Sequence, residues 1–183
     1  MELKLHEELY LNIERCYQYL KQTIEKLNKM NLYQILDEDL IFLNMTLESK
    51  KSVLEKLSKS LASKTNINED LVFEKLYERE KLGPTALGNG VAIPHARLDN
   101  LDKINLIIII LNEGIEFDAN DGDKVDLIFA LLVPNCKSDD HVKVLGGITE
   151  MLDDKSIRQQ IKNASSSKNL AEIIRNFDEK KQK

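Results

Sequence analysis

The chain has 183 residues, of which 42% are apolar and 31% charged, and its formal net charge at pH 7 is −5. This composition is that of one globular domain of ordinary size with a short appendage, and the negative balance argues against a general nucleic-acid surface. The longest apolar runs, residues 106–111 and 127–133, are too short to cross a bilayer, and the N-terminus lacks the apolar core of a signal peptide, so we expect a cytoplasmic protein without direct membrane insertion.

Residues 1–36 are predicted to form a helical extension. From residue 3 onward, apolar or small side chains recur in alternating steps of four and three, as in the seam of a coiled coil: Leu9, Ile13, Cys16, Leu20, Thr23, Leu27 and Met30. Two interpretations remain open: the helix packs on its own domain, or it forms a homodimer or another partner contact through residues 5–33. The second is favoured because an isolated apolar stripe must be covered by something.

Residues 37–178 are predicted to form the main domain, and residues 179–183 a frayed tail. The polar residues 37–39 mark the boundary, and capping residues at 46–49 and 66–68 precede two helical patterns. In chain order we expect a strand at 40–45, helices ending near residues 63 and 79, strands at 105–111 and 125–133, and helices at 141–152, 156–162 and 168–177. The helix that ends near residue 79 should bury Leu71, Val72, Leu76 and Tyr77.

The segment from Arg79 to Arg97 differs in composition from the rest of the chain. It holds three of the seven glycines and two of the three prolines, which predicts a flexible loop that runs into a short strand at residues 91–93. Pro94 disfavours the helical conformation for the residue before it. The imidazole of His95 should therefore be presented at a strand end.

A histidine in this position can carry a phosphoryl group. Near neutral pH the uncharged imidazole has one nucleophilic nitrogen, while its other nitrogen can donate a hydrogen bond. Donors suited to phosphoryl oxygens lie nearby in the sequence: the loop amides of residues 83–90, the Thr85 hydroxyl, the Asn89 side chain and the guanidinium of Arg79 or Arg97. On spacing alone, however, a lone histidine in a turn is more often structural or merely exposed.

The full segment reads Arg-Glu-x-x-Gly-x-Thr-x-x-Gly-Asn-Gly-x-Ala-Ile-Pro-His-Ala-Arg, and a second block follows at residues 115–119 and 125–134, with His141 after it. The two blocks resemble the enzyme IIA proteins of the bacterial phosphoenolpyruvate-dependent phosphotransferase system, in the fructose/mannitol class. Within that class the sequence of the motif is most similar to the nitrogen-related branch. The resemblance covers about residues 40–177.

The resemblance implies a role for each residue of the motif. His95 matches the histidine that receives a phosphoryl group from an HPr-like phosphocarrier, His141 matches a second histidine close to it, and Arg79 matches an arginine sixteen residues before it. The expected phosphoryl-binding residues are Thr85, Gly88, Asn89, Gly90 and Arg97. The three histidines and two cysteines are not spaced as metal ligands, so neither a metal nor a cofactor is expected.

The expected fold is an α/β domain with a mixed sheet of four or five strands and helices on both faces, preceded by the helical extension. The implied function is a phosphotransferase component that acts as a regulatory protein, whose two phosphorylation states bind different target proteins. The alternative is a sugar-transport protein that passes the phosphoryl group to a IIB domain of the fructose/mannitol type. A third possibility is an interaction module that uses the N-terminal helix without phosphorylation.

Overall fold

The computed structural model describes residues 31–99, 101–135 and 140–181, without the side chains of residues 140 and 141. The chain divides into two compact units, residues 1–30 and residues 31–183. The predicted coiled-coil helix and the homodimer contact through residues 5–33 fall almost wholly in the first unit, outside the described residues. All of the described residues belong to the second unit.

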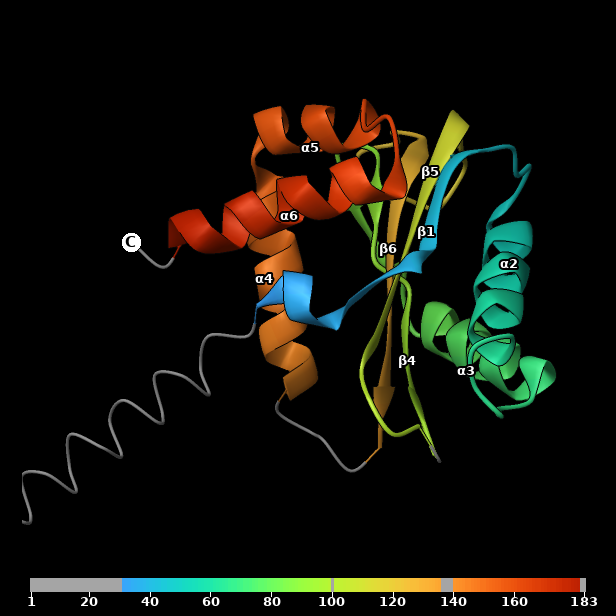
Figure 1. Ribbon diagram of the computed structural model, residues 1–183. Coiled ribbons are helices and arrows are strands. Elements are labelled where there is room, and N and C mark those ends of the chain that lie inside the picture. Colours follow the sequence, from blue (N-terminus) through green and yellow to red (C-terminus); the bar gives the residue numbers. More distant parts are fainter. Residues whose placement is uncertain (1–30, 100, 136–139, 182–183) are drawn as a thin grey trace, which may run out of the picture. The chain divides into compact units, whose positions relative to one another are not determined.

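A six-stranded mixed sheet forms the centre of this unit (Figure 1). Its strands are β1 (Leu36–Met45), β2 (Ala86–Gly88), β3 (Val91–Ala92), β4 (His95–Leu98), β5 (Asn105–Ile115) and β6 (Val125–Pro134). The order along the sheet is β1-β5-β6-β3-β2, and β4 also pairs with β6. Strands β1 and β5 are parallel, β5 and β6 are antiparallel, and both β3 and β4 run parallel to β6.

The predicted fold class is confirmed, with six strands in place of the expected four or five. The additional strands are β2 and β4, and β4 follows β3 along the same edge of β6. Pro94 separates them because it has no backbone N–H to donate, but its carbonyl still accepts from the N–H of Leu131 at 2.9 Å. His95 consequently begins β4, paired with Leu131 in the register of the sheet.

Helices cover both faces of the sheet, as expected. They are α2 (Lys50–Ala62), α3 (Glu69–Lys81), α4 (Asp140–Asp153), α5 (Lys155–Lys162) and α6 (Ser167–Lys181). Helices α2 and α3 lie on one face, and α4, α5 and α6 lie on the other (Figure 1). The side chains of Ser49 and Asn68 cap α2 and α3. None of the helices in residues 31–181, as far as these are described, is long and apolar enough to span a membrane.

The predicted buried face of α3 needs a correction. Val72, Leu76 and Glu80 are buried, whereas Leu71 is 38% exposed and Tyr77 45% exposed. Residues four apart lie on the same side of a helix, and this row of three faces the protein interior. A charged residue, Glu80, completes the buried row, which an apolar pattern could not reveal.

The long helix predicted to reach residue 36 does not include its last residues. The chain instead forms a 3-10 turn, η1 (Leu32–Ile35), and then enters β1 at Leu36. Leu32 is buried against Gly147 of α4, and the N–H of Tyr33 donates to the Asp178 carboxylate of α6 at 2.8 Å. Burial of a leucine side chain contributes about 1.5–3 kcal/mol, which is more than the helix propensity of a residue at the end of a helix contributes.

Two predicted boundaries also differ from the structure. The polar residues 37–39 belong to β1, an outer strand of the sheet, where Asp37 and Asp39 form ion pairs with Lys64 of the α2–α3 connection. Charged residues are common on such strands. The tail predicted to fray is helical as far as Lys181, whose ammonium pairs with Glu150 of α4.

Candidate functional site

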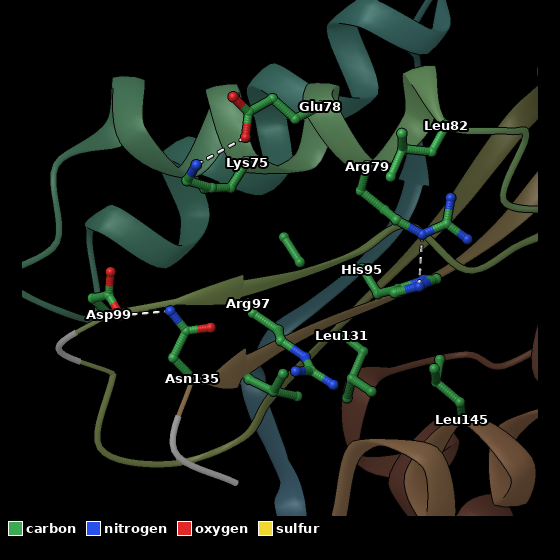
Figure 2. A pocket seen from close by; sticks show the side chains of 12 residues that line it. Lys75, Glu78, Arg79, Leu82, His95, Arg97, Asp99, Leu131, Asn135 and Leu145 are labelled. Carbon is green, nitrogen blue, oxygen red and sulfur yellow. Dashed lines mark hydrogen bonds and ion pairs between the residues drawn. The ribbon is translucent and has the colours of Figure 1, made fainter. Parts of the chain in front are cut away.

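A pocket of about 660 Å³ lies along β4, next to His95 (Figure 2). The C-terminal half of α3 forms one wall, the end of β6 forms another, and Leu145 reaches it from α4. Its lining residues are Lys75, Glu78, Arg79, Leu82, His95, Ala96, Arg97, Asp99, Leu131, Val133, Asn135 and Leu145. Basic, acidic and apolar side chains therefore meet around a partly buried histidine.

Hydrogen bonds at both ring nitrogens of His95 favour one tautomer of the neutral ring. Nδ1 lies 2.9 Å from the Ile93 carbonyl oxygen, and Nε2 lies 2.9 Å from Nε of Arg79. A carbonyl oxygen can only accept a hydrogen bond and a guanidinium can only donate one. The neutral ring with its proton on Nδ1 satisfies both contacts, so the nucleophilic lone pair is on Nε2.

The last turn of α3 places Arg79 over this lone pair. Its Nε–H donates to His95, while Nη1 donates to the Gly83 carbonyl oxygen at 3.0 Å. Figure 2 shows the guanidinium directly beside the imidazole. A permanent positive charge thus lies in contact with the nucleophilic nitrogen of His95.

Thr85 lies near this pair in the sequence but does not line the pocket. It is buried, its hydroxyl donates to Oε2 of Glu80 at 2.7 Å, and its N–H donates to Oε1 of the same carboxylate at 3.2 Å. The hydroxyl expected to bind phosphoryl oxygens is therefore engaged by a carboxylate.

Gly88 ends β2, Asn89 and Gly90 form the turn to β3, and none of the three lines the pocket. All three have positive φ, at 90°, 54° and 76°. The turn packs on Asp121, which accepts the N–H of Asn89 at 2.8 Å. This hydrogen bond, with a second one from the N–H of Asp123, holds the pKa of the Asp121 carboxyl below its usual value.

Arg97 lines the same pocket as His95 because residues two apart on a strand point to the same side of the sheet. His141 lies in the first turn of α4, and its side chain is outside the described part of the structure. Leu145, one turn further along that helix, lines the pocket. The structure therefore brings together Arg79, His95 and Arg97, and it places the backbone of His141 on the helix that borders them.

Several pocket residues were not predicted from the sequence. Lys75 and Leu82 lie one turn before and one turn after Glu78 and Arg79, so helical periodicity from Arg79 could have identified them. Leu82 is 85% exposed, an unusual degree for a leucine. Asn135 follows β6 and donates to the Asp99 carboxylate, a contact that depends on strand pairing. No group of three His, Cys, Asp or Glu side chains in the described residues is arranged to hold a metal ion.

Comparison with known proteins confirms the predicted resemblance. The family model described as "Phosphoenolpyruvate-dependent sugar phosphotransferase system, EIIA 2" matches residues 34–177. The "Nitrogen regulatory protein" of Bradyrhizobium diazoefficiens is 39% identical over 130 residues, which are 71% of this chain and 85% of that protein. The protein of the same name from Pseudomonas aeruginosa is 37% identical over 146 residues, covering 79% of this chain and 95% of the relative.

A solved structure agrees with these sequence matches. The crystal structure of nitrogen regulatory protein IIA-Ntr from Neisseria meningitidis has a TM-score of 0.75 and 38% identity, and the match covers 78% of this chain and 97% of that one. The family model spans every strand of the sheet, and it includes both His95 and Arg79. The chain therefore belongs to the EIIA 2 family of the phosphoenolpyruvate-dependent sugar phosphotransferase system.

Proposed function

We propose that this protein carries a phosphoryl group on Nε2 of His95, received from an HPr-like phosphocarrier in the cytoplasm, and that it acts as a regulatory protein through its phosphorylation state. One observation carries the assignment: His95 has its lone pair on Nε2, and Arg79 touches that atom at 2.9 Å. A nucleophile in contact with a fixed cation is what transfer of a doubly charged group requires.

The transfer exchanges one nitrogen–phosphorus bond for another. Nε2 of His95 attacks the phosphorus of the donor's phosphohistidine, whose ring carries a proton on its other nitrogen; the donor's nitrogen–phosphorus bond breaks, and the electron pair returns to the donor's imidazole, which leaves as a neutral ring. The proton on Nδ1 stays in place, hydrogen-bonded to the Ile93 carbonyl. Arg79 then donates to the phosphoryl oxygens in place of the ring nitrogen, so its charge is in position before the reaction.

We assign Arg97 and His141 to the outer side of the bound phosphoryl group. Arg97 lines the pocket on the same side of β4 as His95. His141 lies at the N-terminus of α4, where backbone N–H groups and the helix dipole favour an anion. Thr85 and residues 88–90 act by holding the segment that carries His95, since their hydrogen bonds go to Glu80 and Asp121.

A regulatory role is supported by similarity to proteins named nitrogen regulatory protein, which cover most of this chain. The second candidate is a sugar-transport protein that passes the phosphoryl group to a IIB domain. The description of the family model, which names a sugar phosphotransferase system, supports that alternative. Both candidates share the same chemistry at His95 and differ in what receives or senses the group.

Intact-mass analysis tests the proposal. The protein is incubated with phosphoenolpyruvate, enzyme I and an HPr-like carrier, beside the variants His95→Ala and His141→Ala. The wild-type protein should gain one acid-labile phosphoryl group, His95→Ala none, and His141→Ala one at a lower rate. Absence of the group on wild type with several HPr-type donors would contradict the proposal. Rapid transfer onward to a fructose- or mannitol-type IIB domain would favour the sugar-transport alternative.

A further inference from the structure

We infer that buried Glu80, paired with Lys50, is the positioning residue that holds Arg79 and His95 in the relative positions required for phosphoryl transfer. The inference rests on the proposed function of His95 and adds two residues to it, one of them on a helix that does not line the pocket. One line of contacts leads from the Glu80 carboxylate to the imidazole, and a second leads from the Glu80 backbone carbonyl to the guanidinium.

Three donors surround this carboxylate. The Glu80 side chain is only 6% exposed, and Oε1 accepts from the Lys50 ammonium at 2.8 Å and from the N–H of Thr85 at 3.2 Å. Oε2 accepts from the Thr85 hydroxyl at 2.7 Å. A buried carboxylate without a counter-ion is strongly unfavourable, and the ammonium of Lys50 is the counter-ion of Glu80.

The first line of contacts leads from Glu80 to the imidazole. Thr85 is fixed by its N–H and hydroxyl on Glu80, and its carbonyl accepts the N–H of Ile93 at 2.9 Å. The carbonyl of Ile93 in turn accepts Nδ1–H of His95 at 2.9 Å. Ile93, whose carbonyl sets the tautomer of His95, is therefore connected to Glu80 through one intervening residue, Thr85.

The second line leads from Glu80 to the guanidinium. Glu80 directly follows Arg79 in the last turn of α3, and its backbone carbonyl accepts the N–H of Gly83 at 3.2 Å. The Gly83 carbonyl accepts Nη1 of Arg79. Glu80 thus contacts the strand segment that carries His95 through its carboxylate, and the loop that accepts from Arg79 through its backbone carbonyl.

Lys50 joins this arrangement from α2. Its ammonium contacts Glu80 and Asp118, and it lies 4.8 Å from the centre of the Phe117 ring. Burial lowers the pKa of Lys50, but the hydrogen bonds to Asp118 and Glu80 outweigh that effect and leave it above its usual value. Asp118 is 81% exposed and touches this arrangement through Lys50, which makes it a suitable control.

Substitutions along these lines separate positioning from stability. Glu80→Gln removes one charged acceptor, so at least one of the three donors loses its partner. Thr85→Val removes only the hydroxyl contact, whereas Thr85→Ser retains it. Asp118→Asn removes the exposed partner of Lys50 and leaves Glu80 intact. The thermal midpoint of each variant shows whether it folds.

Two readouts are measured on each folded variant. The first is the rate of phosphoryl transfer from the HPr-like carrier, which should fall on the order of tenfold to a hundredfold in Glu80→Gln and Thr85→Val, because small displacements of reacting groups have effects of this size. The second is the ¹H–¹⁵N NMR spectrum of the unphosphorylated His95 ring. Wild type should show the Nδ1–H form, and the two variants a mixture of tautomers. Thr85→Ser and Asp118→Asn should match wild type in both readouts.

The inference is overturned if Glu80→Gln and Thr85→Val keep the wild-type ring spectrum and transfer rate, or if Asp118→Asn is impaired as strongly as they are. If Glu80→Gln does not fold, the comparison of Thr85→Val with Thr85→Ser decides alone. The NMR readout needs no phosphoryl donor. A wild-type protein that no carrier phosphorylates would therefore refute the proposed function while the positioning role is still judged by the ring spectrum.

Discussion

Two hydrogen bonds distinguish His95 from an ordinary exposed histidine. The Ile93 carbonyl retains the proton on Nδ1, and the Arg79 guanidinium faces the lone pair on Nε2. A lysine ammonium could supply the charge of Arg79, but its single nitrogen cannot replace the two separate nitrogens, Nε and Nη1, that donate to the ring and to the Gly83 carbonyl. The geometry of the guanidinium is therefore expected to matter as much as its charge.

Arg79→Lys should lower the rate of phosphoryl transfer on the order of 10²-fold, the usual effect of removing one fixed donor from a transition state. The measurement is quenched-flow transfer from the HPr-like carrier. Arg175→Lys, at a half-exposed arginine of α6, is the matched control and should transfer at the wild-type rate. Equal rates for Arg79→Lys and wild type would show that charge alone suffices.

Gly88→Ala should destabilise the fold by about 1–3 kcal/mol, because alanine resists its φ of 90° and a methyl group would lie 2.7 Å from Oδ2 of Asp121. Urea unfolding measures the effect. Gly122→Ala is the control, since Gly122 has a φ of 75° but nothing within 4 Å of the added carbon. If both variants lose the same free energy, the contact with Asp121 contributes nothing.

The sequence motif indicated which residues share the pocket better than it indicated which residues support them. The motif identified His95, Arg79 and Arg97, and the structure places all three in one pocket. It also suggested Thr85 as a phosphoryl ligand, although the hydroxyl donates to Glu80. Whether the Thr85 hydroxyl donates to Glu80 or to a bound phosphoryl group depends on how α3 packs, and a linear sequence pattern carries no information about that packing.

Among the elements, the strands with long runs of β-branched and aliphatic residues were the easiest to predict. The β-branched, aliphatic runs of β5 and β6 are buried on both faces, as a central strand requires. The short strand β3 falls within the strand predicted at residues 91–93, whereas β2 and β4 were missed because three or four residues are too few to show a period, and these two exist through pairing with β3 and β6. The turn η1 was missed because it depends on distant contacts: it packs on α4 and α6, which are more than a hundred residues away in the sequence.

The attachment of η1 to α6 should make stability depend on pH. Burial raises the pKa of Asp178 above its usual value near 3.8, against the opposing effect of the N–H groups of Tyr33 and Leu32 and the charge of Lys181. The folded state therefore holds the proton more tightly than the unfolded chain. The stabilisation from this group is full below the usual pKa and is lost as the pH rises through the raised value.

Asp178→Asn removes this dependence. The difference in free energy of unfolding, variant minus wild type, should therefore increase from about pH 4 to about pH 7, measured by urea unfolding at each pH. The same substitution at the exposed Asp153 provides the reference. A difference that stays constant with pH, or that decreases, would contradict the account of Asp178.

At the scale of the whole molecule, the chain divides into residues 1–30 and residues 31–183, whereas the boundary predicted from the sequence was at residue 36. Residues 31–181 contain the sheet, both helical layers and the pocket. We expect that deletion of residues 1–30 leaves the thermal midpoint and the phosphoryl transfer rate unchanged but abolishes self-association through residues 5–33. Analytical ultracentrifugation of both forms measures this, and equal association states would contradict the dimer prediction.

The central claim is that Nε2 of His95 accepts the phosphoryl group. Its most direct test is the long-range ¹H–¹⁵N NMR spectrum of the protein labelled in its histidines, recorded before and after incubation with phosphoenolpyruvate, enzyme I and the HPr-like carrier. We predict one modified ring, that of His95, with phosphorus on Nε2 and the proton still on Nδ1. A phosphoryl group on Nδ1 or on another histidine, or an unchanged spectrum, would contradict the claim.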